Sequence, residues 1–263
     1  MTIGLLVPVS YSQYPHDLYK LHKKNSVGKF AIKKITIPKG KELQHYTKEK
    51  GMCRSVFLTS YKTVQLCQLD GDPDEEDDVW MSDTPMEYET NQRAIEDSEG
   101  SVLELGLGIG LFTYYVSKKK NVRSITIVEK EQDVIDLVYP KIKNKKTRII
   151  TQDAIEYLKT TDHLFDTIHI DLWADIIHFK EMKPIIKIAK KKLKPNGIVI
   201  CWLDEFLQKV MIELKIGKRT SSGIGYFEPC ITCGKILRND YGGFCMDCAD
   251  GLGISELGMK VKH

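Results

Sequence analysis

The sequence predicts an α/β chain built on a parallel sheet, and residues 101–110 are the strongest reason for this prediction. The apolar residues at 102, 103 and 105 suit a strand that is buried on both faces. Alternating glycines follow, and a helical pattern begins at Leu111. Further apolar runs indicate strands at 123–128, 148–150, 165–171 and 197–203, with helical segments between them. This alternation of strands and helices is typical of a parallel sheet.

The glycine turn, Gly106-x-Gly108-x-Gly110, indicates what kind of ligand the sheet binds. A strand, a glycine turn and a helix together let a ligand lie against backbone at a helix N-terminus. The dinucleotide fingerprint G-x-G-x-x-G requires glycine at position 111, where this chain has leucine. With Glu104 two residues before the first glycine, the turn resembles the first motif of class I S-adenosylmethionine (SAM) methyltransferases.

Two acidic residues on the following strands extend this motif. Glu129 ends a predicted strand and stands 19 residues after Gly110. A carboxylate about 20 residues from the turn can accept hydrogen bonds from both ribose hydroxyls of a nucleoside cofactor. A solvated strand-end charge is the alternative. Asp153 fits a helix N-cap with Glu156 completing a capping box. The resemblance implies that Asp153 and Ala154 also face the adenine, and the two roles are compatible.

Composition and charge exclude several classes of function. The chain has 263 residues, 42% hydrophobic and 29% charged, which are ordinary values for a globular protein. A net charge of +3 is too small to indicate nucleic-acid binding by itself. The acidic block at 70–78 and the lysine-rich segment 183–194 are interpreted as solvated surface. No apolar segment approaches 18 residues and the first ten residues lack a basic start, so we expect a cytoplasmic protein without a membrane partner.

The first 80 residues are expected to form a small, mostly β region. Phe30, Ile32, Ile35 and Ile37 alternate with one slip at 33–34, which indicates a bulged strand. His16, His22 and His45 share no metal-ligand spacing and are interpreted as surface residues. Thr84, Pro85 and Glu87 then fit a helix start. This helix should run to about Ser98, just before the glycine strand.

A family resemblance covers residues 79–203, about half of the chain. It is carried by VWMSDTPMEYETNQ, EGSVLELGLGIGL, VEKEQDVIDLV and the Asp-Leu-Trp-Ala-Asp run at 171–175. These motifs resemble a group of class I methyltransferase-like proteins, often phage-encoded and related in architecture to spermidine synthases. The resemblance implies a Rossmann-like methyltransferase sheet that binds SAM. It assigns Gly106, Gly108, Gly110, Glu129 and Asp153 to the cofactor, and Met81, Ser82 and Asp83 to its methionine end.

The turn after the strand at 165–171 should carry the reacting group, because ligands of open parallel sheets bind beyond the carboxyl ends of the strands. We expect Asp171 to orient the SAM amino group or the nucleophile, and Trp173 to form a stacking wall or to pack in the core. His169 is interpreted as a hydrogen-bonded core residue rather than a base. Cys201 is the one candidate for a cytosine-C5 type nucleophile and is interpreted as core.

Differences from known enzymes narrow the chemistry further. The D/N-P-P-Y/F run of amino-methylating DNA enzymes is replaced by DLWA. Spermidine synthases place two aspartates three apart where Asp171 and Asp175 are four apart. Their glycine motif usually carries Asp where this chain has Ile109. Both departures argue against aminopropyl transfer.

A C-terminal zinc module is predicted from the spacing Cys230-x2-Cys233 and Cys245-x2-Cys248. Four thiolates satisfy Zn²⁺ without an open position, so the ion would be structural. Two disulfides are the disfavoured alternative, because they would require an oxidising compartment and nothing in the sequence indicates one. The pattern resembles treble-clef and ribbon fingers of nucleic-acid-associated proteins. The finger and the lysine-rich surface could dock nucleic acid or protein, with protein docking or a plain structural role favoured.

The predicted organisation has four parts: a β region at 1–80, a SAM-binding domain at 81–217, a zinc finger at 226–251 and a flexible tail at 252–263. The leading hypothesis is a SAM-dependent methyltransferase whose acceptor is unknown. The second is aminopropyl transfer from decarboxylated SAM to a polyamine. The third is a non-catalytic nucleic-acid- or protein-binding protein on a methyltransferase fold.

Overall fold

The computed structural model describes residues 6–9, 17–47, 51–69, 78–172, 179–202, 228–229 and 236–237. Internal contacts divide the chain into two units. One unit contains residues 4–172 and 188–202, and the other contains residues 1–3, 173–187 and 203–263. The candidate site lies entirely within the first unit.

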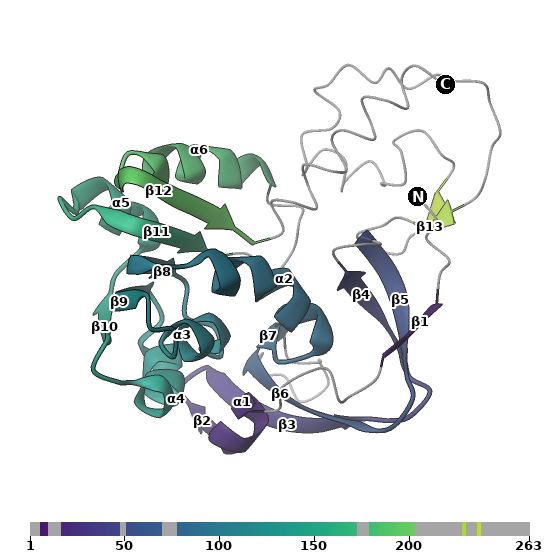
Figure 1. Cartoon of the computed structure of the whole chain (residues 1–263). Coiled ribbons are helices and arrows are strands. Elements are labelled where there is room, and N and C mark those ends of the chain that lie inside the picture. The colour runs from purple at the N-terminus through teal and green to yellow at the C-terminus, as the bar shows by residue number, and fades with distance from the viewer. Residues whose placement is uncertain are drawn as a thin grey trace, which may run out of the picture. The chain divides into compact units, whose positions relative to one another are not determined.

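The centre of the first unit is a five-stranded parallel sheet (Figure 1), which confirms the predicted α/β class. Its strands are β8 (Gly100–Leu105), β9 (Val122–Glu129), β10 (Thr147–Thr151), β11 (Phe165–Ile170) and β12 (Leu193–Cys201). They are ordered β10-β9-β8-β11-β12. Strands β9 and β10 are therefore added on one side of β8, and strands β11 and β12 on the other side. The helices of this unit include α2 (Pro85–Asp97), α3 (Leu111–Val116), α4 (Gln132–Ile142) and α5 (Ala154–Thr160). Helix α6 (Phe179–Lys190) is divided between the two units at residue 187.

The boundary between α6 and β12 differs from the sequence interpretation. The apolar residues at 185, 186, 189 and 193 predict a helix over 183–193 that Asn196-Gly197 would end. The helix ends instead at Lys190, and Leu193 already pairs with Phe165 of β11. Asn196 has a φ of 65° inside β12, where the register shifts between the Phe165 and Thr167 pairs. The turn-forming pair therefore makes an irregularity in a strand, a role that Asn and Gly serve equally well.

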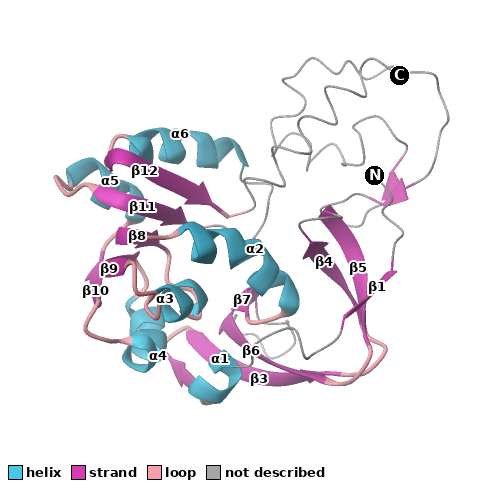
Figure 2. Ribbon diagram, in the orientation of Figure 1, coloured by secondary structure: helices cyan, strands magenta, loops and turns pink. Residues whose placement is uncertain are grey.

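The N-terminal region is mostly β, as expected, and forms two sheets (Figure 2). One has the order β2-β3-β6-β7, formed by β2 (Asn25–Val27), β3 (Phe30–Ile37), β6 (Tyr61–Gln68) and β7 (Asp78–Ser82). The other has the order β1-β5-β4, formed by β1 (Leu6–Val9), β5 (Gly51–Phe57) and β4 (Glu42–Thr47). The bulge expected in β3 is absent from its ladder with β6, which is regular, and the irregularity lies between β6 and β7.

The N-terminal sheet and the parallel sheet share one apolar core. Phe30, Leu66 and Met81 of the first belong to the same buried cluster as Ile125 of the second, and the cluster also contains Ile109 and Phe112, which follow β8. Helix α4 also contacts β2 and β3 directly. A short helix, α1 (Asp17–Leu21), buries Leu18 in the same cluster. The N-terminal region therefore supports the segment that follows β8.

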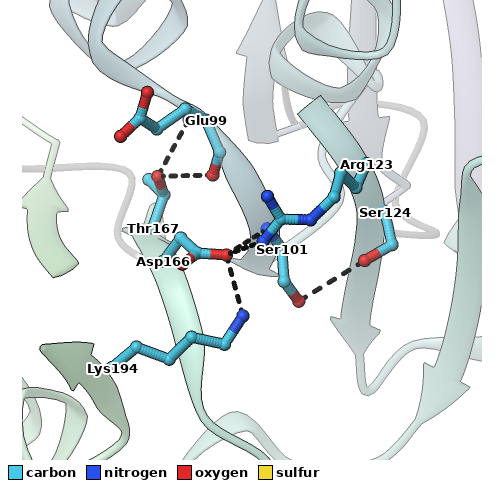
Figure 3. A network of polar contacts seen from close by, with 7 residues as sticks. All are labelled: Glu99, Ser101, Arg123, Ser124, Asp166, Thr167 and Lys194. Atoms are coloured by element: carbon cyan, nitrogen blue, oxygen red, sulfur yellow. Dashed lines mark hydrogen bonds and ion pairs between the residues drawn. The ribbon is translucent and has the colours of Figure 1, made fainter. Parts of the chain in front are cut away.

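Asp166 ties the amino-terminal ends of the parallel strands together (Figure 3). Its Oδ2 accepts hydrogen bonds from the backbone N–H of Ser101 (2.6 Å) and from Arg123 (2.7 Å) and Lys194 (2.8 Å). These donors come from β8, β9 and β12. Burial raises the pKa of this carboxyl, but the bonds from Lys194 and Ser101 outweigh burial and hold it below its ordinary value. The network is structural, because ligands of such sheets bind at the opposite edge.

Within the second unit the structure describes two short strands, β13 (Glu228–Pro229) and β14 (Ile236–Leu237), which pair antiparallel. The four predicted zinc ligands lie outside the described residues, so the zinc site stays a prediction. Among the residues that are described, no helix is long and apolar enough to cross a membrane.

Candidate functional site

The point where the strand order reverses lies between the carboxyl ends of β8 and β11, and sheets of this order bind ligands there. The glycine turn follows β8 and Asp171 follows β11. The N–H of Asp171 donates to the carbonyl of Leu105 (3.0 Å), and the N–H of Gly106 donates to the carbonyl of Val128 on β9 (2.9 Å). The turn and Asp171 are therefore fixed directly beside each other.

Each of the three glycines has a separate structural reason. All have positive φ: 91° at Gly106, 51° at Gly108 and 76° at Gly110. A Cβ at Gly106 would overlap the backbone carbonyl of Asp171, and a Cβ at Gly108 would overlap the sulfur of Met81. A Cβ at Gly110 would lie 2.8 Å from the side chain of Ile142. Because these three residues have no side chain, other atoms of the protein can pack against the turn. The glycine spacing alone did not show this.

Glu129 faces the glycine turn rather than solvent. Its side chain is 8% exposed, and its Oε2 accepts a hydrogen bond from the backbone N–H of Leu107 (3.0 Å). Its Oε1 accepts from the N–H of Glu131 (2.9 Å). A carboxylate has about four lone-pair positions, so both oxygens can still accept from vicinal ribose hydroxyls. The position and the chemistry of Glu129 fit the nucleoside part of the predicted cofactor.

Glu104 lies in β8 beneath this turn and is almost completely buried. The hydroxyl of Thr113, on α3, donates a hydrogen bond to its carboxyl. Burial raises the pKa of Glu104 to about 8; the bond from Thr113 opposes this shift, and the charge of Asp171 adds to it. Glu104 is therefore expected to hold a proton at neutral pH in the protein without ligand.

Two more carboxyls with raised pKa values lie at the same place. Burial raises the pKa of Asp171 to about 7. Burial and the neighbouring charge of Asp171 raise that of Glu87 to about 8. Among the residues that the structure describes, no cation contributes to the pKa shifts of these three carboxyls. Because buried carboxyls without a cationic partner favour the neutral form, a bound cation would find uncompensated acceptors here.

Glu87 is the site residue that sequence reasoning missed. The pattern Thr-Pro-x-Glu is fully explained by a helix start, and Thr84 is the N-cap residue of α2. Its side chain makes no capping hydrogen bond, and its N–H donates to the hydroxyl of Ser82 (3.4 Å). The carboxyl of Glu87 instead lies close enough to Asp171 for their charges to interact. Only the fold could show this contact.

The predicted methionine-end residues have unequal surroundings. The sulfur of Met81 lies 3.4 Å from the N–H of Ile109 and accepts its hydrogen bond. The hydroxyls of Ser82 and Thr84 are 3.0 Å apart. Asp83 is buried, and its Oδ1 accepts from the hydroxyl of Thr63 (2.6 Å) and from a β6 backbone N–H (2.8 Å). Met81 thus reaches the glycine turn, whereas these contacts of Asp83 fix the end of β7.

The turn after β10 confirms Asp153 as a helix N-cap, while the carboxylate of Glu156, predicted to complete a capping box, accepts a hydrogen bond from Lys159 (2.8 Å). Asp153 is the N-cap of α5, and its Oδ1 accepts from the N–H groups of Ile155 (2.9 Å) and Glu156 (3.0 Å). Asp153 is exposed and Ala154 is buried. Their contact with adenine stays a prediction. Trp173, predicted as a stacking wall, lies outside the described residues.

Two histidines and one cysteine test other interpretations. His22 was interpreted as a surface residue, and this was wrong: it is 1% exposed, and its Nε2 lies 2.9 Å from the carbonyl oxygen of Ile109. His169 is a core residue, as predicted, but it stacks on Phe112 with ring centroids 4.0 Å apart. Its Nδ1 has no hydrogen-bond partner within the described part of the chain, and burial lowers its pKa to about 3. Cys201 is buried in β12, as predicted.

Comparison with known proteins adds sequence relatives to this geometry. A family model described as the spermine/spermidine synthase domain matches residues 86–247. A polyamine aminopropyltransferase of Leptospira interrogans serogroup Icterohaemorrhagiae serovar copenhageni (strain Fiocruz L1-130) is 34% identical over 80 residues. That match covers 27% of this chain and 16% of the relative, so it spans only a small part of the relative's length.

Solved structures of methyltransferases are also similar over part of the chain. The N-methyltransferase NodS from Bradyrhizobium japonicum WM9 is 18% identical with a TM-score of 0.35, covering 43% of this chain and 62% of its own. The O-methyltransferase TomG from Streptomyces achromogenes, in complex with SAM, is 15% identical with a TM-score of 0.36. That match covers 43% of this chain and 52% of TomG.

Proposed function

Because the chain belongs to the spermine/spermidine synthase domain family, we propose that it is a transferase that moves a methyl group from SAM to an amine acceptor. The observation that carries this proposal is the group of three carboxyls with raised pKa values, Glu87, Glu104 and Asp171, beside the glycine turn. A sulfonium donor and an amine acceptor are both cationic, and cations compensate buried carboxylates.

The residues of this site have distinct proposed roles. Glu129 accepts from the ribose hydroxyls, and Asp153 with Ala154 borders the adenine. Met81 and Ser82 lie toward the methionine end. Bound SAM supplies a methyl carbon that its sulfonium charge already makes electrophilic. The protein therefore contributes mainly alignment, which is worth roughly 7–11 kcal/mol in well-oriented intramolecular reactions.

Asp171 is the proposed acceptor-binding and catalytic residue. An amine attacks as its neutral form, so a proton must leave the ammonium group before transfer. A carboxyl whose pKa is raised to about 7 can accept that proton at neutral pH. Glu87 shares this environment and would hold a second ammonium group of an extended amine. Trp173 lies outside the described residues, and its role as a stacking wall stays a prediction from the sequence.

Aminopropyl transfer from decarboxylated SAM is the second candidate. The family match and the aminopropyltransferase relative support it. A second support is that, within the described ranges, no cation contributes to the pKa shifts of the three carboxyls, because a donor without a carboxylate needs no cationic partner. Ile109 argues against it: this residue is fully buried in an apolar cluster where the motif usually carries Asp.

Calorimetry of the full chain with SAM and with decarboxylated SAM tests the donor. We expect the wild type to bind SAM in the micromolar range and Glu129→Gln to bind it at least tenfold more weakly. The two Glu129 oxygens each accept a backbone N–H, and in glutamine one of these oxygens is replaced by an NH₂ group, which cannot accept. Glu156→Gln is the matched control, an exposed glutamate on α5. A preference for decarboxylated SAM, with putrescine consumed, would favour the second candidate. No heat with either donor at millimolar concentration would refute both.

A further inference from the structure

We infer that His22 and Met81 are positioning residues for the donor site. Together they hold the backbone N–H and the backbone carbonyl of Ile109 in the glycine turn. The assignment rests on the proposed function for its consequence, but its geometry stands independently. Both side chains come from the N-terminal region, which lies outside the segment of the family match.

His22 holds the carbonyl group. It follows α1, and its own N–H donates to the carbonyl of Leu18 (2.9 Å), which fixes its backbone. Burial lowers the pKa of the imidazole, so the ring is neutral near pH 7. A carbonyl oxygen is only an acceptor, so the Nε2 at 2.9 Å from Ile109 must carry the hydrogen. This bond joins residues 87 positions apart in the sequence.

Met81 holds the amide group. Its sulfur accepts from the N–H of Ile109 at 3.4 Å and occupies the position that a Cβ on Gly108 would take. The side chain is 9% exposed. It is held from behind, since Met81 pairs with Leu66 in the β6–β7 ladder and the carboxylate of Asp83 binds β6 just beyond.

These two contacts fix the turn before any ligand arrives. Gly108 and Gly110, on either side of Ile109, both have positive φ, so glycine flexibility would otherwise let this segment sample other conformations. The N–H and the carbonyl of Ile109 are both hydrogen-bonded to side chains, so the turn keeps one conformation. Glu129, which accepts from the N–H of Leu107 in the same turn, keeps its position as well. A preorganised site binds more tightly because less ordering accompanies binding. The N-terminal region therefore sets the affinity of the donor site.

The test compares His22→Gln with His22→Leu. Glutamine can still donate to the Ile109 carbonyl, whereas leucine leaves it without a partner. We expect His22→Leu to speed amide hydrogen exchange of the peptide covering residues 106–112 by about tenfold or more, without ligand. SAM affinity should fall by a similar factor. His22→Gln should restore both quantities to within about threefold of the wild type.

Two further variants separate positioning from general stability. Met81→Leu keeps the approximate volume but removes the sulfur acceptor, and it should speed exchange in the same peptide. Ile37→Ala weakens a separate buried cluster, which Ile37 forms with Phe57 and Tyr61, and serves as the control for lost stability.

The hydrogen-exchange results test the roles of His22 and Met81, and the binding results test the proposed function. The inference is overturned if His22→Leu and Met81→Leu leave exchange at 106–112 unchanged. It is also overturned if Ile37→Ala, at an equal loss of thermal stability, accelerates exchange at 106–112 as much. If the wild type binds no SAM, the proposed function fails, while the exchange experiment still judges the contacts of His22 and Met81.

Discussion

Binding of a cationic donor beside the glycine turn should release protons, and Glu104 makes the effect measurable. Without ligand the pKa of this carboxyl is about 8 against an ordinary 4.5, with burial as the main cause. At pH 7 Glu104 is therefore mostly protonated. A unit positive charge at about 4 Å contributes roughly 4 kcal/mol at an effective dielectric constant of about 20, which corresponds to about three pK units. Such a charge would return the pKa toward its ordinary value.

The released proton links affinity to pH. Each proton released changes affinity by up to about tenfold per pH unit. We expect SAM binding to strengthen by roughly 10- to 100-fold between pH 6 and pH 8 and to level off above pH 8. Asp171 is electrostatically coupled to Glu104 and also to Glu87, so the titration belongs to the group of three, and one to two protons should leave in total.

Calorimetry in buffers of different ionisation enthalpy counts these protons directly. Glu104→Gln keeps an acceptor for the Thr113 hydroxyl and should lower the count by about one. Glu156→Gln, exposed on α5, should leave it unchanged. Methylthioadenosine, which lacks the sulfonium charge, should release none. Equal binding enthalpies for SAM in all buffers would refute the idea that these carboxyls exchange protons for a cation.

Three other predictions concern stability and metal content. Gly106→Ala should destabilise the fold by about 3 kcal/mol or more and abolish donor binding, because its Cβ would overlap the Asp171 carbonyl at a φ of 91°; chemical denaturation and calorimetry check this. Asp166→Asn should cost about 1–2 kcal/mol near pH 7. The pKa of Asp166 is lower in the folded state than its ordinary value of 3.8. The difference in stability between the wild type and Asp166→Asn should therefore be fully present above pH 3.8 and be lost as the pH falls through the folded-state pKa, which denaturation at several pH values would show. Native mass spectrometry should find one zinc ion per chain, lost when Cys230 and Cys245 are replaced by serine.

Local sequence signals predicted the centre of the fold well. The apolar runs, the glycine turn and the Thr-Pro start of α2 are each encoded within about ten residues, where backbone preference and period decide the structure. The N-cap role of Asp153 follows from the same local chemistry. Asn196 shows the limit of these signals, because a turn-forming residue serves a strand irregularity as readily as a helix end.

Contacts between distant segments were not accessible from the sequence. Nothing in the sequence around His22 indicates that its side chain binds the carbonyl of Ile109, 87 residues further along the chain. Glu87 was hidden by a different cause, since a helix-start pattern already accounted for its residue type. Its role emerges only because α2 brings it to Asp171. A residue with a sufficient local explanation can thus still belong to a site.

The glycine turn shows why a motif and its function are not the same observation. Its spacing predicted a bare backbone for the ligand, yet a side chain at any of the three glycines would first meet Asp171, Met81 or Ile142. The glycines are needed for the protein to pack against itself at the end of β8. What distinguishes this site chemically is the set of carboxyls around that turn. Because no cation in the described part of the chain contributes to the pKa shifts of those carboxyls, the selectivity of the site should follow ligand charge more closely than it follows the glycine pattern.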